Sequence, residues 1–419
     1  MSLILHIYTV ALCIVTKTNA FTTSYTSQLH SIQDTSKNVK SVIQPVLEPD
    51  ELHELALANT QKIPGSKTYL KSWRYWSDHA TKSIRYALSQ NLPAPVNMEA
   101  TNKLQFELGQ AADYGKMPSF HDSGGRSGYA LDFFCRVLLL TDLLAETLAQ
   151  ADKKKFDSFE NYQTAFESEL YRQFHKTTNA SNINVASIGG GPGYDFVAIS
   201  LLAYYRNIMQ SSHKTAIHSY VFDYEEGWSD LVSCMSTATQ KTLMTQTQSN
   251  DIFSCDFGGK CDITKSLYHS SNESILKTMN EINIWICQYC VAENAVKLRE
   301  SDFIFFRDIF TQANDSSLFI FTETTHRLWP EFVNIIQLLS TDHSKIKNNK
   351  SHGFEISFPK QKGRGGSYGW QMVICKKKGL SINDDVLDLC ELFIKDRQHH
   401  QRKIENGFVR QKKKVIGAK

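Results

Sequence analysis

A glycine-rich turn is the segment of this sequence whose residue types and spacing are best suited to chemistry. The run Val185-Ala-Ser-Ile-Gly-Gly-Gly-Pro-Gly-Tyr-Asp195 places Gly189, Gly191 and Gly193 directly after an apolar stretch. Glycine permits a tight turn and lets a ligand approach the backbone, because no Cβ is in the way. Open α/β sheets bind nucleosides at the carboxyl end of the first strand. The spacing Gly-x-Gly-x-Gly therefore predicts a nucleoside site, whereas Tyr194 stands where a dinucleotide fingerprint needs its third glycine.

The elements that must position this turn follow from the pattern of apolar runs. Seven strands are expected, at residues 184–188, 218–222, 252–255, 282–287, 318–321, 354–358 and 370–375. Helical stretches separate the first six, which favours parallel pairing, and a Gly-rich connection typical of a hairpin joins the last two. The sequence predicts a Rossmann-like α/β sheet that ends in an antiparallel hairpin. Residues 48–181 lack strand signals and are expected to be helical, notably at 69–88 and 131–148.

Composition excludes several classes of protein. The 419 residues are 41% apolar with few Gly and Pro, which rules out a largely disordered chain, a collagen-like repeat and a disulfide-stapled miniprotein. The net charge of +3 conceals an asymmetry, because residues 341–419 hold 18 Lys/Arg and 8 Asp/Glu. Most cysteines lie inside apolar runs, which indicates buried free thiols. Cys287-Gln-Tyr-Cys290 lacks the second pair that a zinc site needs, so no metal site is expected.

Residues 182–379 resemble a class I S-adenosylmethionine-dependent methyltransferase. Ile188-Gly-Gly-Gly-Pro-Gly193 is similar to the first motif of that family, and the expected sheet is similar to its fold. The resemblance implies S-adenosylmethionine as cofactor, and it places around the cofactor Ser187, Gly189, Gly190, Gly191, Gly193, Asp223, Tyr224, Asp256, Asp262, Ile263 and Gln288. Ser187 departs from the family pattern, because many members have there an acidic residue that holds the methionyl ammonium.

Acidic residues after the second and third strands are implied to recognise the nucleoside. Asp223 would accept both ribose hydroxyls with its two oxygens, and Tyr224 would pack on the adenosine. The alternative for Asp223 is a helix N-cap, since acidic residues follow it. Adenine recognition falls to Asp256 or Asp262. Asp262 is slightly favoured, because Ile263 follows it and a helix is expected shortly afterwards.

The candidate catalytic residues follow the fourth and fifth strands. In the family, the segment after the fourth strand faces donor and acceptor, which implies that Gln288, Tyr289 and Glu293 line the reaction site. This segment lacks the Asn-Pro-Pro-Tyr form of enzymes that methylate base amino groups. Glu323 and His326 lie where the family has acceptor-facing loops. His326 is a candidate general base, with a helix start as the alternative. Positioning alone can suffice for methyl transfer, so a base is not required.

The chain is expected to begin with a presequence. Residues 1–20 contain an apolar core too short to span a bilayer, which favours a signal peptide, and residues 21–47 form a Ser/Thr-rich transit-like segment. Together they resemble the bipartite plastid presequences of algae with secondary plastids; the secretory pathway and the cytoplasm are the alternatives. No transmembrane segment is expected in the mature chain. Residues 48–181 are a candidate acceptor cap, 182–379 the methyltransferase domain, and 380–419 a C-terminal helix with a basic tail.

The leading interpretation is methyl transfer from S-adenosylmethionine to an undetermined acceptor, either a small molecule or RNA. A protein that binds S-adenosylmethionine without transferring the methyl group is the first alternative, and a nicotinamide-dependent oxidoreductase is a weaker one. Basic clusters at 345–350, 360–364, 376–378 and 410–414 suit an RNA backbone, although basic residues in loops and tails more often form a solvated surface. The loop 121–128, with Arg126, is expected either to hold an anion at the following helix or to be a connector. The oligomeric state does not follow from the sequence.

Overall fold

The computed structural model describes most of one compact unit, Val46–Lys419. The described residues are 46–59, 62, 66–114, 118–156, 164–175, 181–209, 214–244, 252–342, 353–359 and 369–416. The expected presequence lies outside them, apart from residues 46 and 47. Within the ranges just given, the search for a helix long and apolar enough to cross a membrane finds none.

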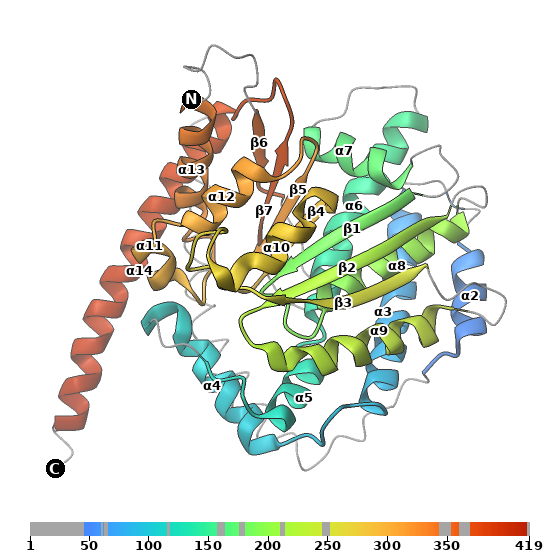
Figure 1. The fold of residues 1–419 in the computed structure, drawn as a ribbon, viewed down its shortest axis with the longest axis horizontal. Helices are drawn as coiled ribbons and strands as arrows, with labels where there is room; N and C mark the ends of the chain where they lie inside the picture. Colours follow the sequence, from blue (N-terminus) through green and yellow to red (C-terminus); the bar gives the residue numbers. More distant parts are fainter. Residues whose placement is uncertain are drawn as a thin grey trace, which may run out of the picture. The chain divides into compact units, whose positions relative to one another are not determined.

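The strands form a single seven-stranded sheet (Figure 1). The strands are β1 (Ser181–Ile188), β2 (Thr215–Asp223), β3 (Phe253–Lys260), β4 (Ile284–Gln288), β5 (Leu318–Glu323), β6 (Phe354–Ser357) and β7 (Trp370–Lys376). Their order is β3-β2-β1-β4-β5-β7-β6. The first five pair in parallel, whereas β7 is antiparallel to both β5 and β6. The predicted α/β fold with a terminal antiparallel hairpin is therefore confirmed, and β7 lies between β5 and β6.

Helices cover both faces of the sheet (Figure 1). The first face is covered by α2 (Pro49–Leu57), α3 (Lys67–Ser89), α4 (Met98–Tyr114), α5 (Ser123–Asp132), α6 (Arg136–Phe156), α7 (Ala165–Phe174), α8 (Tyr194–Met209) and α9 (Ser229–Leu243). The second is covered by α10 (Glu273–Thr278), α11 (Ala295–Glu300), α12 (Ile304–Gln312), α13 (Trp329–Asp342) and α14 (Asp384–Ile416). Short 3-10 turns are η2 (Glu226–Trp228), η3 (Ser270–Asn272) and η4 (Met279–Glu281). Because side chains alternate along a strand, Val185 joins the first core and Ala186 the second.

The helices before residue 182 share a core with the sheet. Trp73 and Trp76 of α3 pack edge-on or stacked against Tyr204 and Tyr205 of α8. The four rings are buried almost completely and belong to the same cluster as Val185 of β1. The change near residue 182 is therefore a change of secondary structure within one compact unit.

Three elements differ from their predicted extents. The helix expected over 131–148 breaks at residues 133–135, so Arg136 begins a new helix. Strand β3 continues to Lys260, beyond the expected 255, through a register shift opposite Phe222. Gly258 lies there against the Phe222 ring, where a Cβ would come within 2.6 Å, so glycines that weaken a strand signal are part of the strand. Helix α14 runs to Ile416, through the segment that was expected to be a tail.

Candidate functional site

The glycine turn connects β1 to α8, as predicted. Gly189, Gly191 and Gly193 have φ values of 62°, 52° and 91°, in the region that favours glycine. The Gly189 amide donates to the Phe222 carbonyl at 2.8 Å, which joins the turn to β2. A side chain at Gly189 would also collide with Cys290, which follows β4. The turn is therefore closely enclosed by the ends of β2 and β4.

Asp223 lies at the carboxyl end of β2, against the glycine turn. One carboxylate oxygen accepts the Gly191 amide and the other accepts the Glu225 amide, both at 3.0 Å. Burial raises the pKa of Asp223 to about 6, although these amides oppose the rise. The cap of η2 is Glu225, whose side chain accepts the Gly227 amide. Tyr224 is 60% exposed, with the Lys260 ammonium 5.1 Å from its ring centre.

Asp195 is a buried carboxylate that contacts Ser187. The Ser187 hydroxyl and the side-chain Nε2 of Gln288 each donate to one oxygen of Asp195, which is 1% exposed at the start of α8. Burial raises the pKa of Asp195 to about 6. An acid thus stands beside position 187 even though that position is serine. The sequence prediction missed it, and the available signal was a lone acidic residue opening an otherwise apolar helix.

The two candidate adenine-binding acids lie in different environments. Asp256 is in the middle of β3 and its side chain is 66% exposed, 3.7 Å from His218. Asp262 follows the end of β3, where the neighbouring Cys261 amide donates to the Asp223 carbonyl at 2.9 Å. Asp262 and the buried Ile263 therefore lie at the edge of the sheet that carries Asp223, whereas Asp256 does not.

The turn after β4 brings two predicted residues toward the same edge. Tyr289 has a φ of 56°, which is rare for a residue with a side chain, and its amide donates to the Thr322 carbonyl at 2.8 Å. Burial raises the pKa of Glu293 to about 7, and the Arg136 charge opposes the rise. Glu323 accepts the amides of residues 291 and 292 at 2.7 and 3.2 Å. It braces this turn from β5.

Arg136 is a site residue that the sequence prediction missed. It donates to the Tyr129 hydroxyl, and its guanidinium carbon lies 4.2 Å from the ring centre of Tyr289 and 4.6 Å from that of Phe133. Such placements are cation–π contacts. Its positive charge opposes the rise that burial causes in the pKa of Asp195, Glu293 and Glu323. No sequence signal marked Arg136, because it lay inside a single expected helix.

The electrostatics of the site favour a cation. The site contains four carboxyl groups whose pKa is raised, chiefly by burial: Asp195, Asp223, Glu293 and Glu323. Raised pKa values at one site mean that ionising these groups is costly without a compensating positive charge. A positively charged ligand next to them would stabilise their ionised forms.

His326 packs elsewhere, against β7 and α14. Its imidazole Nε2 is 3.1 Å from Asp396, and its ring centre is 4.0 Å from that of Trp370 and 4.5 Å from that of Phe393. Burial lowers the pKa of His326 to about 4. These contacts connect the loop after β5 to α14 and to β7, with the imidazole packed between them.

The loop at residues 121–128 braces η2. Asp122 caps α5 by accepting the Gly125 amide at 2.6 Å, and Arg126 donates to the carbonyls of Phe120 and His121 at 2.6 and 3.0 Å. The Arg126 guanidinium also packs on Gly227. Nη1 of Arg126 is thus engaged with backbone carbonyls, whereas its buried Nε has no hydrogen-bond partner among the described residues.

The predicted basic surface lies only partly among the described residues. Residues 345–350 and 360–364 lie outside the described residues, and the side chains of 410–414 are not described. In the remaining cluster, Lys376 is 1% exposed and donates to the carbonyls of Thr311 and Ala313 at the end of α12. That lysine therefore stabilises a helix terminus and takes no part in a basic surface.

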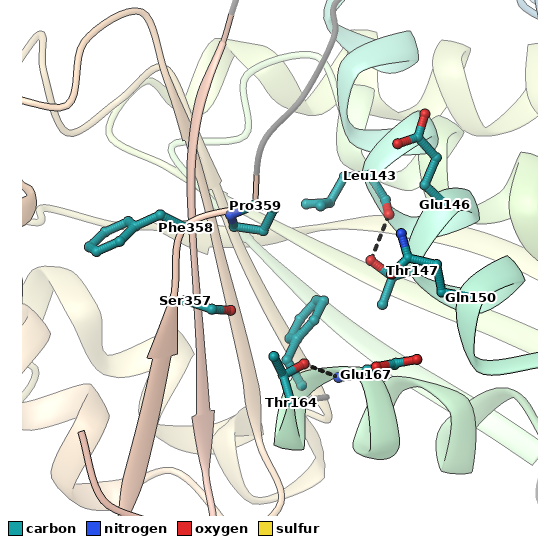
Figure 2. A pocket seen from close by; sticks show the side chains of 10 residues that line it. Leu143, Glu146, Thr147, Gln150, Thr164, Glu167, Ser357, Phe358 and Pro359 are labelled. Atoms are coloured by element: carbon teal, nitrogen blue, oxygen red, sulfur yellow. Dashed lines mark hydrogen bonds between the residues drawn. The ribbon is translucent and has the colours of Figure 1, made fainter. Parts of the chain in front are cut away.

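The described part of the chain contains a cavity at the glycine turn and a larger one away from it. One of about 20 Å³ is lined by Tyr129, Arg136, Gly189, Gly190, Gly191, Pro192, Tyr194, Asp195 and Gln288. A larger one of about 320 Å³ lies between α6, α7 and the end of β6 (Figure 2). In Figure 2, Thr147 donates to the Leu143 carbonyl and the Glu167 amide donates to Thr164, bonds that stabilise α6 and α7 themselves. Of the predicted site residues, Gly189, Gly190, Gly191 and Gln288 line the smaller cavity.

Comparison with known proteins finds structural neighbours only. No protein-family model and no curated protein matches the chain. The neighbours include a candidate class I S-adenosylmethionine-dependent methyltransferase from Listeria monocytogenes (11% identity, 76% of this chain and 99% of that chain, TM-score 0.31). They also include a candidate methyltransferase from Streptococcus mutans in complex with S-adenosylhomocysteine (13%, 50% and 97%, 0.27). A third is the type I restriction-modification methyltransferase subunit from Streptococcus thermophilus (10%, 83% and 81%, 0.28). At these identities and TM-scores nothing about function follows from the likeness.

Proposed function

We propose that this protein binds S-adenosylmethionine at the glycine turn and transfers its methyl group to an acceptor. One observation carries the proposal: Asp223 accepts the Gly191 amide at the carboxyl end of β1, beside the point where the strand order reverses between β1 and β4. Open α/β sheets bind their ligands at such a reversal, outside the carboxyl ends of the strands. Asp195 lies at the same place, with both oxygens held by neighbouring side chains.

The residues at the site fit the chemical groups of S-adenosylmethionine. Asp223 suits the ribose hydroxyls and Arg136 suits the carboxylate. Asp195 and Gln288 suit the ammonium, and the Gln288 side-chain oxygen is buried without a hydrogen-bond partner among the described residues. An unpaired buried acceptor is costly, so a ligand N–H there would be stabilising. When bound, S-adenosylmethionine would supply a methyl group on a positively charged sulfur, a charge that suits the four carboxyl groups.

Binding requires side chains to move. A cavity of about 20 Å³ has room for about one water molecule, whereas ligand pockets are usually hundreds of Å³. Tyr129 and Arg136, from α5 and α6, line that cavity together with the glycine turn. We expect their side chains to change position when the ligand enters.

The protein's own groups then orient the acceptor and take up a proton where one is released. Glu293, with a pKa raised to about 7, can accept a proton from an O–H or N–H acceptor near neutral pH. The ring centre of Tyr289 lies 4.2 Å from the Arg136 guanidinium carbon, so this ring would lie beside the acceptor. A small molecule or RNA as acceptor, and a plastid location, belong to this proposal as expectations from the sequence.

Calorimetric titration of the full chain with S-adenosylhomocysteine and with NADH tests the proposal. We expect binding of the first and none of the second. Asp262→Asn should weaken the first, while Asp256→Asn, the same change on an exposed acid, should not. Failure of the wild-type chain to bind S-adenosylhomocysteine would refute the proposal. Binding without transfer of a radiolabelled methyl group to small-molecule, RNA or protein pools would favour a non-catalytic binding protein. A fluorescent protein fused after residues 1–47 tests the plastid location.

A further inference from the structure

A glutamate on the next strand helps to hold the turn after β4 in place. Glu323 ends β5 and accepts the Val291 and Ala292 amides at 2.7 and 3.2 Å with one oxygen. Its side chain is buried, with 1% of the residue exposed. Tyr289, at the start of the turn, has a φ of 56°. A turn that begins in such a rare conformation needs contacts that hold it there.

The second oxygen of Glu323 is buried and has no hydrogen-bond partner among the described residues. Burial and the nearby Glu293 raise the pKa of Glu323 to about 8, while the two amides and Arg136 oppose the rise. The other titratable groups that interact with it are Tyr289, Cys287 and Cys290. Burial therefore favours the protonated form of Glu323 near neutral pH, whereas the two amides favour the ionised form.

The turn touches the glycine turn at several points. Gln288, just before it, donates to Asp195, and Cys290 lies against Gly189. The ring of Tyr289 lies under the Arg136 guanidinium. A displacement of the turn would therefore disturb the groups around the small cavity.

We propose that Glu323 is a positioning residue, which fixes the turn at residues 289–293 by accepting two of its amides and so holds Tyr289 and Glu293 beside the donor site. Its effect on ligand binding rests on the proposed function, whereas its effect on the turn does not. Glutamine has the same shape as a neutral glutamic acid, with one oxygen to accept the amides. Glu323→Gln should therefore preserve the turn, and Glu323→Ala should release it.

Glu355 is a matched control within the same chain. From β6 it accepts the Ala165 and Phe166 amides at 2.5 and 3.4 Å, at the start of α7. The arrangement of one carboxyl oxygen with two backbone amides is the same, but it braces a helix that does not line the small cavity. Glu355→Ala therefore measures the general cost of losing such a brace.

The test compares wild type, Glu323→Gln, Glu323→Ala and Glu355→Ala in the full chain. The readouts are calorimetric affinity for S-adenosylhomocysteine and hydrogen-exchange protection of the Val291 and Ala292 amides. Near neutral pH, Glu323→Ala should lower both by roughly tenfold, because two buried amides lose their acceptor. Glu323→Gln should match wild type within about threefold, and Glu355→Ala should do the same, since neither change removes an acceptor from this turn.

A pH series separates positioning from a general structural role. Because burial raises the pKa of Glu323 to about 8, its contribution to the stability of the turn falls as the pH rises through about 8. Wild type should therefore lose affinity and protection over this range, whereas Glu323→Gln should lose less. Glu293 titrates in both proteins, so the difference between them isolates Glu323. Parallel pH curves, or a Glu323→Gln protein as impaired as Glu323→Ala near neutral pH, would overturn the inference.

The outcomes also separate this inference from the proposed function. If wild type does not bind S-adenosylhomocysteine, the proposed function fails, and amide protection alone still tests Glu323. Unchanged protection of Val291 and Ala292 in Glu323→Ala would then overturn the positioning role. If Glu323→Ala does not fold, the pH series on Glu323→Gln decides the question.

Discussion

Replacing Asp223 by asparagine should affect ligand binding and stability very differently. In the structure, one carboxylate oxygen accepts the Gly191 amide and the other the Glu225 amide, both at 3.0 Å. Asparagine has one oxygen, and its amino group would face the second amide. One buried amide would then lose its acceptor, at a cost of about 1–3 kcal/mol in the free energy of unfolding.

An opposing effect offsets that cost. Burial raises the pKa of Asp223 from 3.8 to about 6. Each unit of pKa corresponds to about 1.4 kcal/mol, so ionising this group in the folded protein at neutral pH costs about 3 kcal/mol, and asparagine avoids this cost. The two effects have similar size and opposite sign, so stability near pH 7.5 should change by no more than about 2 kcal/mol.

The pH dependence of stability gives the sign of the difference between Asp223→Asn and wild type independently. Because the pKa of Asp223 is raised on folding, the protonated form stabilises the wild type fully below about 3.8. That stabilisation is lost as the pH rises through about 6. Asp223→Asn should therefore gain stability relative to wild type between pH 4 and pH 7, by up to about 3 kcal/mol. Urea denaturation at several pH values measures this difference.

Binding should show a large loss. Two charge-assisted hydrogen bonds to a ribose diol contribute about 1.5–3 kcal/mol each, so losing one lowers affinity for S-adenosylhomocysteine roughly 10- to 100-fold. Calorimetry measures the affinity, and Asp256→Asn, on an exposed acid of β3, is the control. Unchanged affinity in Asp223→Asn would refute the ribose assignment. A flat stability difference across the pH series would refute the account of its burial.

Three other substitutions test separate parts of the structure. Arg136→Met removes the charge that opposes the raised pKa of Glu293; the pKa of Glu293, followed by NMR, should rise further, and affinity for S-adenosylhomocysteine should fall roughly tenfold. Asp152→Ala leaves Arg206 buried without the carboxylate that it contacts at 2.8 and 3.2 Å, which should cost about 3–5 kcal/mol in urea denaturation. His326→Gln should leave affinity unchanged. Because the folded pKa of His326 is lowered to about 4, wild type should lose stability as the pH falls from about 6.5 toward 4, and the variant should lose less.

Local pattern was sufficient for the framework of the site. Each expected strand overlaps an observed one, because buried parallel strands are short apolar runs that stand out between helical stretches. The glycine turn was predictable for the same reason, since Gly189, Gly191 and Gly193 adopt conformations that other residues rarely do. Asp223 was predictable because the last residue of a parallel strand lies where the carboxyl ends of its neighbours also lie.

Local pattern failed where a side chain finds its partner from a distant element. Asp195 is held by Ser187, eight residues away, and by Gln288, 93 residues away. His326 pairs with Asp396 of α14 and packs on Trp370 of β7, so its environment was decided by the C-terminal helix. The extent of that helix also differed from the prediction, because charged residues continued it.

The sequence by itself determined the sheet, its antiparallel end and the glycine turn, because periodicity and backbone preference act between neighbouring residues. Only the tertiary structure decided which charges meet there. Arg136 enters the site through a break between two helices, and Glu323 braces a turn that belongs to another strand. Burial raises the pKa of Glu323, and the charge of Arg136 opposes that rise. Burial is a property of the packed protein, so the spacing of residues along the chain does not reveal it.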